Sequence, residues 1–326
     1  SQTLRESFSL ADDLEFSVEI DPNEIDEARI AALAAAGMNR ASIGVQDFDP
    51  DIQQIIGRIQ GYEVTRAAVE ALRKAGIHSL NADILFGLPH QSQHRISESV
   101  QMLLSLSPDR VALYGYAHVP WMAKRQAMIP TDALPSPEER LALFETARRL
   151  FLWDSYQEIG IDHFAKPEDS MAVAARSGHL RRNFQGYTDD TCDVLIGLGA
   201  SAISRFPQGY AQNASSTAAY QKAVRAGELA TGRGHAFKGE DRLRSRMIEM
   251  LMCEFRIDAE AIGREFRLGP TRLTELFTAA AEQFPGMVRI TPEGFDILPE
   301  GRPLARMIAR AFDEYEMRAE GHSSAI

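Results

Sequence analysis

Four short apolar runs in the first 120 residues each end in a polar residue and lead into a stretch with helical character. They are Leu14–Glu19, Ala41–Gln46, Leu80–Asp83 and Val111–His118. This alternation predicts parallel strands joined by crossover helices, and the C-terminal ends of such strands open onto one face. We therefore expect Glu19, Gln46, Asp83 and His118 to converge on a ligand site there, although they lie far apart in the sequence.

The stretches between these runs contain residues that begin and end helices. Asp21 and Pro22 are typical of a helix N-cap and first turn, and Gly37 is typical of a helix end. Amphipathic helices are expected over residues 62–77 and about 92–105. Four such units leave two sheet edges unpaired, so we expect the beginning of a barrel to lie before Ser1.

The pattern changes after Pro120. Ser136 and Pro137 predict the start of a long helix that ends near Ser155, whereas residues 160–215 have little periodicity. Further along, the expected elements are helices at 241–254, 258–266 and 270–283 and a hairpin within 287–301. Helices followed by a small hairpin are typical of a winged-helix module.

These patterns predict an α/β chain with two domains. An incomplete barrel is expected over residues 1–124, and a second, mostly helical domain over 125–326. The winged-helix-like part of the second domain is expected at 240–301.

The composition excludes several classes of function. A net charge of −11 and an isoelectric point of about 5.3 argue against a nucleic-acid partner, so Arg242, Arg244 and Arg246 are interpreted as a solvated face. No apolar run approaches the ~20 residues that span a membrane, and no signal-peptide layout is visible. Cys192 and Cys253 have no neighbours at metal-ligand spacing, which predicts no metal site and a reducing, cytoplasmic location.

Seven strings in the chain resemble one family. They are SVEIDP (17–22), GVQDF (44–48), NADILFGLP (81–89), YGYAHVP (114–120), DHFAKPED (162–169), RNFQGYT (182–188) and GLGASAIS (197–204). In this order they resemble the oxygen-independent coproporphyrinogen III oxidases, or coproporphyrinogen dehydrogenases, of the radical S-adenosylmethionine superfamily. The resemblance covers the chain from about residue 12 to its end. It implies strands three to six of a TIM-like (β/α)6 barrel and then a mostly helical domain that covers the mouth.

The resemblance also implies an activity. In the family, a reduced 4Fe–4S cluster cleaves S-adenosylmethionine to a 5′-deoxyadenosyl radical, which removes hydrogen from the β-carbon of a propionate. Loss of carbon dioxide and an electron leaves a vinyl group. Two such reactions convert coproporphyrinogen III into protoporphyrinogen IX for haem synthesis. The implied partners are coproporphyrinogen III, S-adenosylmethionine and a reductant for the cluster.

The chain departs from the family in the segment that holds the cluster. The family's CxxxCxxC loop and glycine-rich GGTP segment are not in this sequence, and both would lie before Ser1. Three thiolates are needed to hold three irons of the cluster. Cys192 and Cys253 cannot supply them, so we expect the chain as given to be inactive alone.

The resemblance assigns S-adenosylmethionine contacts to several strand ends. Glu19 is implied to bind this cofactor, the alternative being a charge at a helix N-terminus. The positions implied to contact a second S-adenosylmethionine are Gln46, Arg58, Asp83 and, through its backbone, Ala117. An amide, a guanidinium and a carboxylate suit the adenine, carboxylate, ribose and ammonium groups of this ligand. Taken alone, Arg58 would be interpreted as a solvated surface arginine.

Residues 182–188 mix aromatic side chains, amides and a glycine, which is typical of a binding loop. The resemblance places Gln185 and Ile203 at the barrel mouth and implies that Ile203 contacts S-adenosylmethionine. The alternatives are a hydrogen bond from Gln185 to its own loop and core packing of Ile203, which the residues alone favour.

A substrate with four propionates needs cations in its site. Arg181, Arg182 and Arg205 lie in or beside the matched segments, and His118 and His163 are able to donate to a propionate or move a proton. The alternatives are surface arginines and structural histidines.

Two rival functions also stay open: a haem chaperone of the same superfamily, and a non-enzymatic protein that binds S-adenosylmethionine or a tetrapyrrole.

Overall fold

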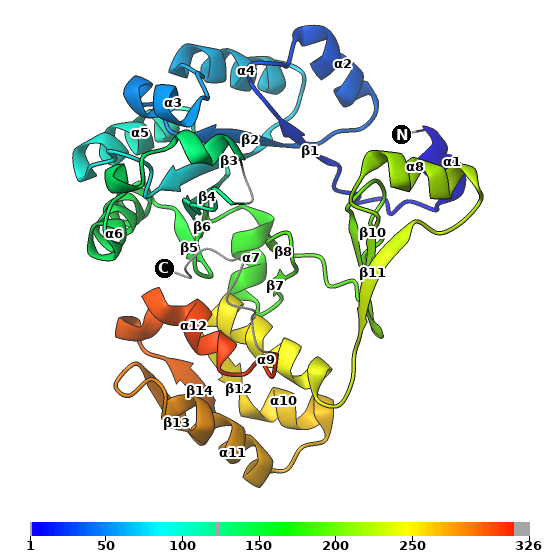
Figure 1. Ribbon diagram of the computed structural model, residues 1–326, viewed down its shortest axis with the longest axis vertical. Helices are drawn as coiled ribbons and strands as arrows, with labels where there is room; N and C mark the ends of the chain where they lie inside the picture. The colour runs from blue at the N-terminus through cyan, green and yellow to red at the C-terminus, as the bar shows by residue number, and fades with distance from the viewer. Residues whose placement is uncertain (1, 122–123, 316–326) are drawn as a thin grey trace. The chain divides into compact units, whose positions relative to one another are not determined.

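The four apolar runs form four parallel strands in a row, as predicted (Figure 1). They are β1 (Ser17–Ile20), β2 (Arg40–Gln46), β3 (Ser79–Phe86) and β4 (Arg110–Gly115). The structure is a computed structural model, and it describes residues 2–121 and 124–315. Within it, residues up to 176 form one compact unit and residues 177–315 form a second, and each is described by itself.

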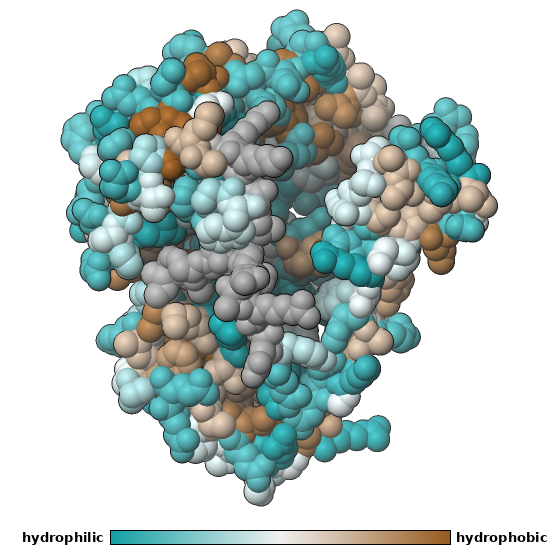
Figure 2. Space-filling model, viewed as in Figure 1, coloured by the Kyte–Doolittle hydropathy of each residue, from teal (hydrophilic) through white to brown (hydrophobic). Residues whose placement is uncertain are grey.

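Helices cover the apolar face of this sheet (Figure 1). They are α2 (Glu27–Ala35), α3 (Pro50–Ile56), α4 (Tyr62–Lys74), α5 (Gln93–Ser105) and α6 (Pro137–Trp153). Fully buried side chains such as Ile43, Leu80 and Phe164 from the strands pack with Leu72 and Phe151 from the helices. Their burial leaves a largely hydrophilic surface on the face shown in Figure 2.

The sheet edge beside β4 is paired, which corrects the expectation of an open edge there. β6 (His163–Ala165) pairs antiparallel with β4, and β5 (Gln157–Ile159) pairs antiparallel with β6. Neither strand was predicted, because a three-residue strand is too short to show an alternating pattern.

The first crossover helix begins later than predicted. Its N-cap is Asp26, whose carboxylate accepts a 2.7 Å hydrogen bond from the Arg29 amide. Asp21 instead accepts from the Asn23 amide at 2.9 Å in a tight turn. Gly37 follows the helix with a φ of 101°, a conformation that glycine adopts without strain.

The remaining elements of this unit are α1 (Gln2–Ser7), α7 (Ser170–Arg176) and two 3-10 turns at Lys124–Met128 and Thr131–Ala133.

The second unit begins with strands that the sequence pattern did not predict. β9 (Ile203–Phe206), β10 (Gly209–Asn213) and β11 (Thr231–Ala236) form an antiparallel sheet, with α8 (Thr217–Arg225) between the last two. Every residue of β11 is exposed, so this strand carries no buried-face pattern. A short ribbon, β7 (Arg181–Arg182) with β8 (Tyr187–Thr188), precedes them.

The end of the second unit has the expected order of helices and hairpin. It contains α9 (Asp241–Glu254), β12 (Arg256–Asp258), α10 (Ala259–Phe266), α11 (Pro270–Ala281), β13 (Val288–Thr291), β14 (Gly294–Ile297), a 3-10 turn (Pro299–Leu304) and α12 (Ala305–Arg310). The strands pair in the order β12-β14-β13. The rings of Phe277, Phe295 and Phe312 contact one another in tilted and edge-to-face arrangements.

Contacts between residues divide the chain at residue 177, whereas the domain boundary expected from the sequence follows residue 124. The domain boundary at 124/125 and the winged-helix-like part at 240–301 stay predictions. The last part of the expected second domain, residues 316–326, lies outside the described residues.

A buried ion cluster closes the N-terminal end of the sheet. Asp169 lies 2.6 Å from Arg110 Nε and 3.7 Å from Arg40 Nη1, and all three side chains are nearly inaccessible. Glu15, 2.8 Å from Arg40 Nε, is the half-exposed fourth member. Removing the central carboxylate would leave buried guanidinium charges without compensation.

Asp169→Asn is expected to lower the free energy of unfolding by about 3–5 kcal/mol, the usual penalty for breaking a buried ion pair. Urea titration followed by circular dichroism measures the change. The control is Glu63→Gln, which removes an exposed pair with Arg66 and is expected to change stability by less than about 1 kcal/mol. Equal effects of the two variants would contradict this role of Asp169.

Candidate functional site

The face of the parallel sheet opposite the helices is polar. Strand register aligns Glu19 with Ser42, and Asp83 with Gly44 and Ala112. Paired residues of neighbouring strands point to the same side of a sheet, so these residues share one face. Ala112 is in turn aligned with His163 of β6. The structure therefore brings together Glu19, Asp83 and His163.

Asp83 is the electrostatic centre of this face. Burial, with a smaller contribution from the nearby Glu19 charge, raises the pKa of its carboxyl to about 6, against the opposing effects of the Asn81 hydrogen bond and the His163 charge. Asn81 Nδ2 donates to Asp83 Oδ1 at 2.9 Å and to Ser42 Oγ at 3.0 Å. A carboxyl in this setting favours a ligand that brings hydroxyl donors or positive charge.

His163 is held by two neighbours. Its Nδ1 lies 2.7 Å from Asp162 Oδ1, and its Nε2 lies 3.4 Å from the Tyr114 hydroxyl. The Asp162 contact orients the ring. His163 thus contributes an oriented imidazole to the polar face of the sheet.

Gln46 and Arg58 meet at the end of β2. Arg58 Nη2 donates to the Gly44 carbonyl at 3.0 Å and lies 3.5 Å from Asp21. A Cβ on Gly44 would lie 2.9 Å from Gln46 Nε2 and 3.2 Å from Arg58 Nη2, so only glycine leaves room for both. Gln46 has a φ of 69°, a strained value that is frequent at functional sites.

Buried amides orient Arg58, and they were not among the predicted site residues. Gln60 Oε1 accepts from Arg58 Nη2 at 3.2 Å, and Gln60 Nε2 donates to Gly44 O at 3.1 Å. Gln53 donates to the Gln60 carbonyl at 2.6 Å. Gln60 and Gln53 are 1% and 3% exposed, and such buried, hydrogen-bonded amides form a positioning network that no local sequence pattern signals.

Asp47 ties the loop after β2 to the loop after β3. This fully buried carboxyl accepts from Ser99 Oγ and Gln91 Nε2, each at 2.7 Å, and from the Asp49 amide at 2.7 Å. Burial raises its pKa. Asp47 directly follows a strand, the kind of position at which ligand-binding residues were predicted. Its carboxylate instead hydrogen-bonds to protein groups and holds the two loops together.

Ala117 and His118 lie in the loop after β4. Ala117 is exposed, and its carbonyl accepts from Gln126 Nε2 at 3.1 Å. His118 Nδ1 lies 3.3 Å from the Tyr116 hydroxyl and its Nε2 lies 3.5 Å from Thr131 Oγ1. His118 therefore bonds within its own loop region.

Arg140, also absent from the predicted site, lies above the ends of β3 and β4. Its Nη1 donates to the Tyr116 carbonyl at 3.0 Å, and a Cβ on Gly87 or Gly115 would approach its guanidinium to 2.5 Å or 3.0 Å. It has no ion-pair partner within the described part of the chain, and burial lowers its pKa. The glycines in FGLP and YGY were the signal for a large side chain at these strand ends.

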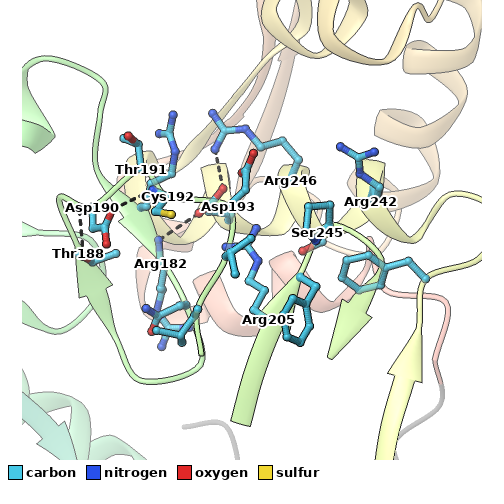
Figure 3. Close-up of a pocket in the computed structure, with 18 of the residues that line it drawn as sticks. Arg182, Thr188, Asp190, Thr191, Cys192, Asp193, Arg205, Arg242, Ser245 and Arg246 are labelled. Carbon is cyan, nitrogen blue, oxygen red and sulfur yellow. Dashed lines mark hydrogen bonds and ion pairs between the residues drawn. The ribbon is translucent and has the colours of Figure 1, made fainter. Parts of the chain in front are cut away.

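Apart from Gln185, the predicted site residues of the second unit line two cavities. Arg181, Arg182 and Arg205 lie in the wall of a cavity of about 250 Å³, shown in Figure 3. Ile203 lines a separate, apolar cavity of about 340 Å³ with Phe184. Gln185 is exposed, and its amide donates to Asn183 Oδ1 at 2.8 Å.

The residues present fit S-adenosylmethionine but not an iron–sulfur cluster. Carboxylates, an amide and a guanidinium around Asp83 and Arg58 match the cofactor's hydroxyl, ammonium and carboxylate groups. Of the two cysteines, Cys192 is exposed, whereas burial raises the pKa of Cys253 to about 12. Among the described residues, no three His, Cys, Asp or Glu side chains are grouped to hold a metal.

Comparison with known proteins places the chain in a family. Residues 3–103 match the Radical SAM superfamily model. The chain is 65% identical over 321 residues to the oxygen-independent coproporphyrinogen III oxidase of Paracoccus denitrificans (strain Pd 1222), covering 98% of this chain and 71% of the relative. The chain belongs to the oxygen-independent coproporphyrinogen III oxidase family.

Two further matches agree with this assignment. The Cereibacter sphaeroides (strain ATCC 17023) oxidase is 61% identical over 93% of this chain and 67% of its own length. The solved structure of Escherichia coli coproporphyrinogen III oxidase (HemN), described as a radical SAM enzyme, is 36% identical with a TM-score of 0.90, over 97% of this chain and 73% of that one. These matches confirm the predicted family and fold class of this coproporphyrinogen III oxidase homologue. Helices able to cross a membrane are absent from its described residues.

Asp83→Asn is expected to stabilise the protein at neutral pH. Because folding raises the pKa of Asp83 from about 3.9 to about 6, the folded state holds the proton more tightly, and stability falls as pH rises from about 4 to 6. The variant removes this loss and should be more stable by about 1–3 kcal/mol at pH 7.5. The gain should vanish below about pH 4.

Urea unfolding at a series of pH values measures this difference. Asp12→Asn, at an exposed carboxylate, is the control and should show no such pH dependence. A variant less stable than the parent at pH 7.5 would show that the Asp83 charge is favoured in the folded state.

Proposed function

We propose that this chain takes part in the oxygen-independent oxidative decarboxylation of coproporphyrinogen III. Two propionate side chains would become vinyl groups, giving protoporphyrinogen IX in haem biosynthesis. The observation that carries this proposal is the membership of the oxidase family together with a polar sheet face built around Asp83.

The polar face of the sheet is proposed to bind S-adenosylmethionine. Glu19 and Asp83 would accept hydrogen bonds from ribose hydroxyls or the ammonium group, and Arg58 would bind a carboxylate. Gln46, the Ala117 backbone, Gln185 and Ile203 complete the proposed set. Two cofactor molecules per site, as the resemblance implies, are part of this proposal. When bound, the cofactor supplies the radical that starts the reaction.

The cluster is proposed to be held by residues other than those of this chain. Cys192 and Cys253 do not fit it, so the chain alone is expected to be catalytically inactive. What its residues supply is orientation of S-adenosylmethionine and a polar sheet face partly shielded from water. A reductant for the cluster is the further partner that this activity needs.

The propionates of the substrate are proposed to meet Arg182 and Arg205, with His118 as a further donor. These residues are supported by charge complementarity, since four carboxylates need cationic partners. No role for nucleic acid or membrane is proposed, in keeping with the acidic composition. A cytoplasmic location stays a prediction.

Glu19→Gln and Arg58→Gln are each expected to weaken S-adenosylmethionine binding by tenfold or more. A hydrogen bond to a charged group contributes about 1.5–3 kcal/mol, and about 1.4 kcal/mol is tenfold in affinity. Isothermal titration calorimetry on the chain measures the affinity. The matched controls are Glu70→Gln and Arg66→Gln, two exposed residues of α4. Unchanged binding by both site variants would contradict the assigned site.

Turnover is tested on two forms of the protein. One is this chain, and the other carries at Ser1 the preceding region of the Paracoccus denitrificans relative. After anaerobic reconstitution with iron and sulfide, coproporphyrinogen III, S-adenosylmethionine and a reductant are added, and vinyl products are measured. Activity is expected only in the longer form, and it should survive Cys192→Ser and Cys253→Ser, because neither thiol fits the cluster.

The rival functions give different results in the same assay. A cluster-loaded protein that binds haem without decarboxylation would be a haem chaperone. A longer form that binds S-adenosylmethionine or a tetrapyrrole but never turns over would be a binding protein. Activity of the short chain would contradict the proposed role of the missing thiolates.

A further inference from the structure

Several separate segments of chain form the wall of the 250 Å³ cavity of the second unit (Figure 3). Arg182 comes from β7 and Arg205 from β9, and the loop 190–194 closes one side. Helix α9 contributes Arg242 and Arg246. The backbone pairing of Arg205 with Leu195 fixes the loop against β9. Five arginines, counting Arg181, therefore line one small cavity of a protein whose net charge is −11.

Four carboxylates line the cavity beside the five arginines, and among the described residues they form ion pairs with Arg246 alone. Glu249 lies 2.6 Å from Arg246 Nη1, and Glu265 lies 3.6 Å from Arg246 Nε. For Arg181, Arg182, Arg205 and Arg242, the described residues provide no ion-pair partner. The remaining acids are Asp190 and Asp193 on the exposed loop, and Asp190 already accepts from the Cys192 amide at 2.8 Å. An excess of cations over anions remains in the cavity wall.

Arg182 is held in place by its neighbours, but one of its hydrogen-bond donors is unsatisfied. Its guanidinium carbon lies 5.4 Å from the centre of the Tyr187 ring, which orients the planar group. Its backbone amide donates to Glu249 at 3.1 Å. Its Nε is buried and has no hydrogen-bond partner in the structure. An unsatisfied buried donor destabilises the structure, and an anionic acceptor in the cavity would offset this loss.

We propose that this cavity seats a single propionate carboxylate of the tetrapyrrole, with Arg205 and Arg242 as its specificity-determining residues. The inference rests on the proposed function and adds Arg242 and the place of binding to it. A volume of about 250 Å³ is below the ~300–1,000 Å³ of pockets for whole drug-sized ligands. It suits a short carboxyalkyl arm, whose methylenes would contact Phe206 and Phe237 in the same wall.

Planar guanidinium groups favour this ligand chemistry. Arginine binds carboxylates with two parallel hydrogen bonds, whereas a strongly hydrated lysine acts as a point charge, and no lysine lines the cavity. Arg242 had been interpreted as part of a solvated face, together with Arg244 and Arg246. Arg242 is indeed exposed, but it faces this cavity, and Arg244 is ion-paired with Glu240 and Glu314.

The test measures binding of coproporphyrin III, the stable oxidised tetracarboxylate, to the whole chain by fluorescence. Arg205→Gln and Arg242→Gln are each expected to weaken binding by tenfold or more. Arg264→Gln is the matched control, because this exposed arginine of α10 pairs with Glu260 outside the cavity and should leave binding unchanged. Neither Arg205 nor Arg242 holds an ion pair in the described chain, so circular dichroism and melting temperature should stay the same.

A second ligand separates carboxylate recognition from apolar packing. The tetramethyl ester of coproporphyrin III carries no charge, and its affinity should be the same for the parent and both variants. If the variants lose affinity equally for acid and ester, or bind the acid as the parent does, the inference is overturned.

Failure of the inference is distinguishable from failure of the proposed function. If the parent protein binds coproporphyrin III and the variants bind it equally well, the proposed role of the cavity is wrong, but the proposed function is not contradicted. Parent protein that binds S-adenosylmethionine but no coproporphyrin III at any accessible concentration overturns both the cavity and the proposed substrate.

Discussion

The alternation of side chains along four parallel strands is the constraint on which the rest of the first unit depends. One face of the sheet must be buried under the crossover helices, so Ile43, Leu80 and their neighbours form the core. The opposite face is then free to carry Glu19 and Asp83. Because strand register places paired residues on one side, a shift by one residue would bury these carboxylates and expose the core.

Asp47, just after β2, and the half-buried Asp83, within β3, show how hydrogen bonding separates a structural carboxyl from a binding carboxyl. Asp47 accepts three hydrogen bonds of 2.7 Å, so its loops are held together and nothing further is needed. Asp83 accepts a side-chain hydrogen bond from Asn81 and lies near the Glu19 charge. Its pKa near 6 therefore leaves it ready for a ligand that supplies donors or positive charge.

The arginines divide in the same way. Arg40 and Arg110 surround Asp169, which makes them part of a buried ion cluster at the closed end of the sheet. Arg205 and Arg242 line a cavity without a carboxylate partner among the described residues. A guanidinium held in a wall without its counter-charge is a better indication of anion binding than a high count of arginines.

Local pattern by itself determined the parallel strands, the helices that cross between them, and the C-terminal helices and hairpin, because period and capping are read within a few residues. The family followed instead from the resemblance of seven strings spread along the chain. It misplaced the N-cap at Asp21 and missed β5, β6 and β9–β11, which are short or exposed. Only the tertiary structure decided that Gln60 orients Arg58, and that Arg182, Arg205 and Arg242 share one cavity. Such groupings depend on how distant segments pack, which no local pattern contains.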